Sequence, residues 1–232
     1  MKYENALCFF DMISLKNENL SKKFQGENIN ISCLNDKNFK ARFYKCEIAS
    51  LSFVLALLCK MSEDEKFQEL DEGYLSAECC FGEEEAREVL EFLQKAEFLF
   101  VDESINFHKD SQNIKYFLNF LSKKFKLKIL NENEEELHFE NAKFSELKEL
   151  DNYDGLVLFK TKLKDKNLHC SKQFLQLSKC QNKSKVKIIA KEFELEGTLF
   201  LDESLQGTIG FLDCENKGFS FAKICIKEIN AN

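Results

Sequence analysis

The chain has 232 residues, of which 44% are apolar, including 24 Phe, and it contains no Trp and no Pro. This composition is typical of a globular protein with a sizeable core and excludes a disordered chain. The formal net charge of −7 argues against nucleic acid as a partner, because a nucleic-acid-binding protein needs a basic surface.

The first 60 residues predict three short strands followed by a buried helix. Residues 1–16 lack the basic start and long apolar stretch of an export signal, so we expect a cytoplasmic protein. Apolar stretches at 6–10, 29–34 and 39–44 predict strands. Residues 46–60 are apolar on nearly every side, which predicts an enclosed helix. Its apolar run, 48–59, is shorter than the roughly 20 residues that span a bilayer, so we expect no direct membrane insertion.

The middle of the chain alternates helical and strand-like patterns. Gly82 precedes three Glu that suit the first turn of a helix. A strand is predicted at 98–101, a second helix on the stripe that begins at Ile114, and further strands at 127–130 and 156–159. Such alternation favours an α/β fold with a small, open, mostly parallel sheet flanked by helices.

A different pattern begins after residue 166. A helix is predicted at 171–179, and several brief strands separated by Gly predict a compact β-rich unit from residue 186 onward. We therefore expect an N-terminal strand segment at 1–45, an α/β domain at 46–166, and a helix with a C-terminal β unit at 167–232.

Ten cysteines are scattered along the chain, and no two are separated by two residues. Zinc and iron–sulfur sites usually take pairs of ligands from short Cys-rich turns, so no metal ligand is assigned. The simplest interpretation is that these thiols are small core hydrophobes. A redox-active vicinal disulfide at Cys79 and Cys80 is the alternative.

The sequence shows no catalytic apparatus. The predicted strand at 98–101 is followed by Asp102-Glu103-Ser104, which would repel a phosphate instead of cradling it in glycines. His169 and Cys170 are adjacent, yet a nucleophile and its base normally come from separate parts of a fold. His108 and His138 are isolated, with His108 the better placed for a site. No residue is assigned a catalytic role.

Charge is distributed unevenly. Residues 63–91 carry 12 acids against Lys66 and Arg87, a balance of −10, whereas residues 156–191 carry ten Lys against Asp165, a balance of +9. If 156–166 were one strand, four alternating lysines would share a face; they are Lys160, Lys162, Lys164 and Lys166. They are either ordinary solvated surface or a docking surface for a protein partner such as an acidic electron carrier.

Residues 73–130 carry a resemblance to a known family. They contain Gly-Tyr-Leu-Ser at 73–76, Gly-Glu-Glu-Glu at 82–85 opening a helix, an apolar strand, and a polar loop with His108 before Asn113-Ile114. This order resembles the molybdopterin-oxidoreductase-like part of the G subunit of bacterial respiratory complex I, and residues 196–213 resemble its terminal β segment. The whole chain is similar to the atypical F-like subunit of complex I in Campylobacter- and Helicobacter-type bacteria.

The resemblance implies a place in the peripheral arm of complex I, a NADH-quinone oxidoreductase. Conventional F and G subunits carry Gly-rich or Cys-rich motifs that this sequence lacks, so NADH oxidation and cluster binding are not carried over. The implied partners are other peripheral-arm subunits, with flavodoxin or ferredoxin as electron donor, and the implied location is the membrane surface, reached through the complex. Flavin, as FAD or FMN, stays open as a family-level expectation. The alternatives are a free-standing flavin-binding protein and a non-respiratory scaffold or regulator.

Overall fold

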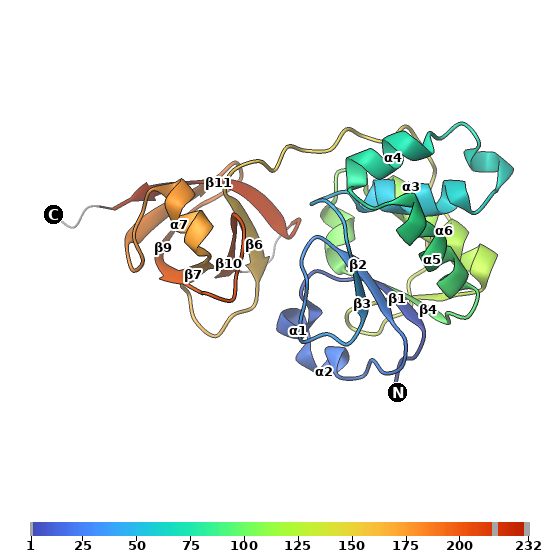
Figure 1. Ribbon diagram of the computed structural model, residues 1–232, viewed down its shortest axis with the longest axis horizontal. Helices are drawn as coiled ribbons and strands as arrows, with labels where there is room; N and C mark the ends of the chain where they lie inside the picture. The colour runs from blue at the N-terminus through green and yellow to red at the C-terminus, as the bar shows by residue number, and fades with distance from the viewer. Residues whose placement is uncertain (1, 215–217, 230–232) are drawn as a thin grey trace. The chain divides into compact units, whose positions relative to one another are not determined.

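The computed structural model describes residues 2–214 and 218–229, and the chain divides into two compact units, Met1–Asp151 and Asn152–Asn232 (Figure 1). Residue 1 of the predicted 1–45 segment, and residues 215–217 and 230–232 of the predicted 167–232 segment, lie outside the described residues. Among the described residues, no helix combines the length and apolarity needed to cross a bilayer.

The first unit is built on a five-stranded parallel sheet in the order β3-β2-β1-β4-β5. Its strands are β1 (Ala6–Phe9), β2 (Ile29–Ser32), β3 (Arg42–Lys45), β4 (Phe98–Val101) and β5 (Lys128–Asn131). Every residue of β1 and β4 is buried. Such continuous burial is expected of central parallel strands covered on both faces.

Helices cover both faces of this sheet. They are α1 (Ile13–Lys16), α2 (Glu18–Ser21), α3 (Leu51–Met61), α4 (Glu72–Cys79), α5 (Glu83–Leu93) and α6 (Ser111–Phe125), with 3₁₀ turns at Glu65–Phe67 and Glu103–Phe107. Leu7 and Phe9 of β1 pack into a core with α3, α5 and α6. Ala6 and Cys8 face the opposite side, where α1 and α2 close a smaller aromatic core. This alternation follows from the two-residue period of a strand.

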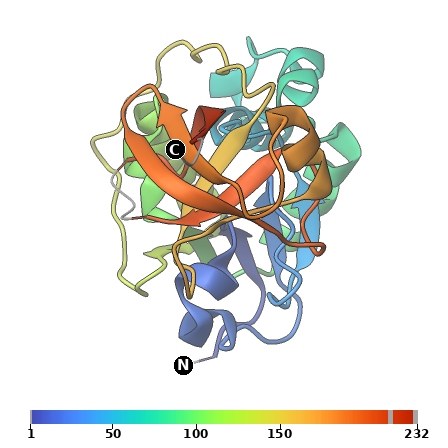
Figure 2. The same ribbon diagram turned by 90° about the vertical axis from the view of Figure 1, so that its left-hand side faces the viewer.

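The second unit is a closed six-stranded barrel in the order β10-β6-β11-β8-β9-β7 (Figure 2). Its elements are β6 (Val157–Thr161), β7 (Leu168–Cys170), α7 (Lys172–Ser178), β8 (Lys185–Ala190), β9 (Glu194–Leu201), β10 (Ile209–Asp213) and β11 (Phe221–Glu228). The pairs β6/β10 and β7/β9 are parallel, and the other pairs are antiparallel.

Helix α7 packs onto the barrel through Phe174, which is fully buried. A Cβ atom at Gly210 would lie 2.9 Å from Leu168 Cδ1 and 3.0 Å from Phe174 Cε2. Gly210 therefore lets the Phe174 ring lie directly against the backbone of β10.

The predicted fold class is confirmed: a parallel sheet flanked by helices is followed by a β-rich unit. The boundaries differ from those expected. The three strands of residues 1–45 belong to the same sheet as β4 and β5, and the strand expected at 156–159 belongs to the barrel as β6. Short apolar runs look alike in either setting, because long-range pairing decides which sheet a strand joins.

Candidate functional site

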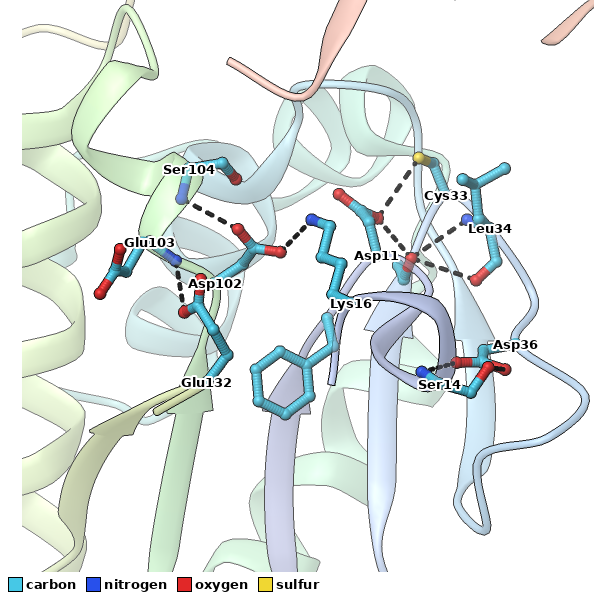
Figure 3. A network of polar contacts seen from close by, with 12 residues as sticks. Asp11, Ser14, Lys16, Cys33, Leu34, Asp36, Asp102, Glu103, Ser104 and Glu132 are labelled. Carbon is cyan, nitrogen blue, oxygen red and sulfur yellow. Dashed lines mark hydrogen bonds and ion pairs between the residues drawn. The ribbon is translucent and has the colours of Figure 1, made fainter. Parts of the chain in front are cut away.

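The chain order of the sheet places a topological switch point between β1 and β4. From β1 the chain continues to β2 and β3 on one side, while β4 and β5 lie on the other. In open parallel sheets, ligands bind beyond the carboxyl ends of the strands at such a point. Asp102 directly follows β4, and Asp11 follows β1 after Phe10. We name the group Asp11, Lys16, Asp102 and Glu132 the carboxyl-edge cluster (Figure 3).

Lys16, the last residue of α1, occupies the centre of this cluster. Its ammonium group forms an ion pair with Asp102, and the two side chains are only 11% and 6% exposed. Figure 3 shows the Lys16 amine between the carboxylates of Asp102 and Asp11. Burial lowers the pKa of Lys16, but Asp102 and then Asp11 outweigh it, so the pKa lies above its ordinary value. Lys16 is therefore held in its charged form.

Asp11 is held by donors from the neighbouring strand. Its Oδ1 accepts a hydrogen bond of 2.5 Å from Ser32 Oγ, and Cys33 Sγ lies 3.6 Å from the same oxygen. Burial raises the pKa of Asp11, and Asp102 adds to this rise, although Lys16, Ser32 and Cys33 oppose it. The first-unit fold thus brings a carboxyl group with a raised pKa to the centre of the sheet edge.

Glu132 supplies a third carboxylate from the residue after β5. It accepts a hydrogen bond of 2.8 Å from Glu103 N. Burial, followed by the charge of Asp102, raises the pKa of Glu132 to about 7. The Glu132 carboxyl group therefore changes its charge near neutral pH. It does so beside the ion pair of Lys16 and Asp102.

Two backbone donors that follow β4, Glu103 N and Ser104 N, are already used within the protein. Asp102 Oδ1 accepts from Ser104 N at 2.9 Å, and Glu132 accepts from Glu103 N. These are the amides after β4 that would face a phosphate bound at the switch point. The carboxylates replace a phosphate as acceptors, and their charge repels one.

The four lysines proposed for docking are not equivalent. Strand β6 ends at Thr161, so Lys160 lies on the strand while Lys162, Lys164 and Lys166 lie in the loop that follows. Lys160 is only 7% exposed, and burial lowers its pKa. Lys166 is exposed and pairs with Asp213 at 2.7 Å. Since the strand stops, the alternation expected from the sequence does not place the four side chains on one strand face.

The cysteines occupy several environments. Five are buried, three are intermediate and two are exposed. Cys79 is buried within α4, whereas Cys80 is exposed at its end. Over residues 2–214 and 218–229, no group of three or more His, Cys, Asp or Glu side chains is arranged to hold a metal ion.

The histidines have distinct partners. His108 Nε2 lies 2.8 Å from Ala49 O, and its Nδ1 accepts from Asp110 N, so it ties two loops together. Burial is the largest influence on His108, and its pKa is lowered. His169 lies 3.0 Å from Asp165, whereas Cys170 Sγ is 3.6 Å from Phe200 O. His169 and Cys170 thus have separate partners. His138 is exposed.

Sequence reasoning identified Asp102 and missed the other members of the cluster. The sequence does contain a local signal for the three carboxylates, since an acidic residue follows each of the apolar runs that form β1, β4 and β5. Their convergence on Lys16 depends on the strand order, which no local pattern shows. Searches of protein-family models and of curated proteins find no match to this chain.

Proposed function

We propose that this protein is an accessory peripheral-arm subunit of a complex I-like NADH-quinone oxidoreductase, without an NADH site or an iron–sulfur cluster of its own. It helps to form the end of the arm at which electrons enter. The observation that carries the proposal is the internal ion pair of Lys16 and Asp102 at the switch point of the parallel sheet. The resemblance of residues 73–130 to the G subunit is the reason for choosing complex I as the assembly.

The side chains that occupy the switch point favour a scaffold over a nucleotide-binding enzyme. A dinucleotide-binding sheet leaves backbone amides at the switch point open to the pyrophosphate, in the turn after its first strand. Here, on the β4 side of the switch point, Glu132 accepts from Glu103 N and Asp102 accepts from Ser104 N. A sheet that closes this edge with its own side chains keeps its shape without a nucleotide, which suits a structural subunit.

The proposed partners are other subunits of the peripheral arm, with flavodoxin or ferredoxin as the electron donor. The exposed lysines of the loop after β6, Lys162 and Lys164, supply positive charge for an acidic donor. Lys160 is excluded from this surface because it is buried. The protein reaches the membrane surface through its partners.

Native co-purification tests this function. The full-length chain, tagged at one end, is purified from detergent-solubilised membranes, and its companions are quantified by mass spectrometry with iron and flavin analysis. We expect quinone-oxidoreductase subunits in fixed stoichiometry. Recovery of the chain without them would contradict the proposal. Respiration of membranes from a deletion strain gives a second measurement: unchanged donor oxidation would instead support the non-respiratory scaffold.

A groove in the first unit favours a second candidate, a free-standing flavin-binding protein. The groove has a volume of about 830 Å³, and its lining includes Phe39, Phe92, Lys40 and Arg42. This volume suits a small-molecule site, and the rings offer apolar contact. Lys40 offers a partner for phosphate, whereas Arg42 is paired with Glu88 at 3.0 Å, and Glu27 and Glu91 also line the groove. A flavin bound there would give the purified chain a yellow colour. A colourless chain that leaves FMN and FAD fluorescence unchanged would eliminate this candidate.

A further inference from the structure

Two cysteines lie side by side where β2 and β3 end. The strands are parallel, and Cys33 and Cys46 directly follow their last register pair, Ser32 and Lys45. The last ladder bond joins Cys46 N to Ser32 O at 3.1 Å. Neighbouring strands are about 4.8 Å apart, which falls within the roughly 4.4–6.8 Å between the Cα atoms of a disulfide.

Both thiols leave the sheet on the same face. The register partners two residues earlier, Ile31 and Tyr44, both pack against the core of α3, α5 and α6. Cys46 packs into that core itself. The bond from Cys46 N to Ser32 O extends the strand pairing by one residue, so Cys33 follows Ile31 onto the same face. The two thiols also interact electrostatically. The pKa of Cys33 is raised by burial, then by the charge of Asp11 and then by the charge of Cys46.

The two cysteine residues differ in their exposure. Cys33 is partly exposed, while Cys46 is only 6% exposed. A third thiol, Cys79, lies nearby, since Glu47 N donates to Cys79 O at 2.8 Å. Its Sγ is held by Phe81 O at 3.7 Å and Ser76 O at 3.8 Å, and it is fully buried. Cys33 is therefore the more exposed residue of the pair, although burial is the largest cause that raises the pKa of its thiol.

We propose that Cys33 and Cys46 are a reversible redox pair, oxidised to a disulfide by exchange with a small-molecule disulfide. Cys33 loses its proton and attacks one sulfur of the oxidant, releasing one thiol and leaving a mixed disulfide. Cys46 then loses its proton and attacks Cys33 Sγ, releasing the second thiol. Two protein thiols give up two electrons and two protons, and one disulfide becomes two thiols.

The pair is coupled to the carboxyl-edge cluster through Asp11. In the reduced protein Cys33 Sγ lies 3.6 Å from Asp11 Oδ1 as a donor (Figure 3). A disulfide has no S–H, so oxidation removes a contact that favours the charged carboxylate. The pKa of Asp11 then rises further, and the charge opposite Lys16 falls. This inference stands independently of the proposed function.

Mapping of the disulfide tests the proposal. The full-length chain carries C80S and C225S, which remove the two exposed thiols. The folded protein is incubated with oxidised glutathione, quenched in acid, alkylated, and digested for tandem mass spectrometry. We expect a linked species joining Cys33 to Cys46, two hydrogen atoms lighter than the reduced pair and reversed by dithiothreitol.

Single substitutions give a matched, asymmetric control. With C46S the second step cannot occur, so glutathione accumulates on Cys33. With C33S the buried Cys46 stays unmodified until the protein is denatured. Burial raises the pKa values of both thiols, so the exchange rate should rise about tenfold for each pH unit between roughly pH 7 and 9.

Three results would overturn the proposal: a bond from Cys46 to Cys79, no glutathione on Cys33 in C46S, or a rate independent of pH. Circular dichroism checks that each variant is folded. If C33S or C46S does not fold, the peptide map of the C80S/C225S chain is the deciding measurement. Absence of the Cys33–Cys46 link from that map would overturn the proposal.

Discussion

Lys16 and Asp102 form an ion pair that joins the end of α1 to the end of β4 across the switch point of the parallel sheet. Both side chains are nearly buried, so the pair is not a surface contact of small energetic weight. It is central to the stability of this edge, because removal of one partner leaves the other charge in a poorly solvated position.

Replacement of Lys16 by Met should therefore destabilise the protein by about 3–5 kcal/mol, since Asp102 and Asp11 lose their shared cation. Urea denaturation at pH 7 measures the loss. The double variant K16M/D102N should recover part of it, because no unpaired charge remains at Asp102. K22M, which breaks the exposed pair with Glu18, is the matched control and should change stability by less than about 0.5 kcal/mol. Equal effects of K16M and K22M would contradict the assignment.

Glu132 should make the protein less stable as pH rises. Its pKa is about 7 in the folded protein, against 4.5 as its ordinary value. Between these values the folded state binds more protons than the unfolded state, so the free energy of unfolding falls with rising pH. The stabilisation is complete below about pH 4.5 and is lost as pH passes 7. Its size is on the order of 1–3 kcal/mol.

Comparison with E132Q isolates this contribution, because Asp11 titrates in the same direction. Urea denaturation of both proteins across this pH range should show a stability difference that changes in favour of E132Q as pH rises. Parallel curves would show that Glu132 titrates normally.

Charge reversal at the loop after β6 should weaken binding of an acidic electron donor. K162E/K164E should lower the affinity strongly at roughly 0.05 M salt and weakly at 0.5 M, because salt screens exposed charges. K183E/K185E changes the charge equally at two other exposed barrel lysines and should have a smaller effect. Titration calorimetry with flavodoxin or ferredoxin measures both. An equal effect of the two variants would indicate a response to net charge alone.

Substitution of Gly210 by Ala should destabilise the barrel. The new Cβ would lie 2.9 Å from Leu168 Cδ1 and 3.0 Å from Phe174 Cε2, an overpacking that costs about 1–3 kcal/mol. F174L removes one of these obstacles, so G210A should be less harmful in that background. A thermodynamic cycle over the four proteins measures the interaction. Additive effects would show that Phe174 does not oppose the new methyl group.

Local patterns were sufficient for several elements of the first unit. The strand expected at 98–101 coincides with β4, and the stripe from Ile114 to Leu121 lies within α6. These predictions depend on the periods of one strand and one helix. The expected domain boundaries had no such local basis, and the structure divides the chain at Asp151 and Asn152 instead.

The candidate site was predicted only in part. Asp102 was expected to repel a phosphate, because it is an acidic residue directly after an apolar strand. Lys16 offered no signal, since a lone lysine in a short polar segment is ordinary in sequence. Lys160 was assigned to a docking surface on the assumption of a continuous strand, but the strand ends at Thr161 and Lys160 is buried.

By itself, the sequence determined the class of the fold, because apolar periodicity is a property of neighbouring residues. Only the tertiary structure decided that Asp11, Asp102 and Glu132 share one lysine, and that Cys33 and Cys46 follow the same register pair of β2 and β3. Strand order and register are set by packing between residues far apart in the chain. The charges and thiols that they bring together therefore have no counterpart in any local pattern.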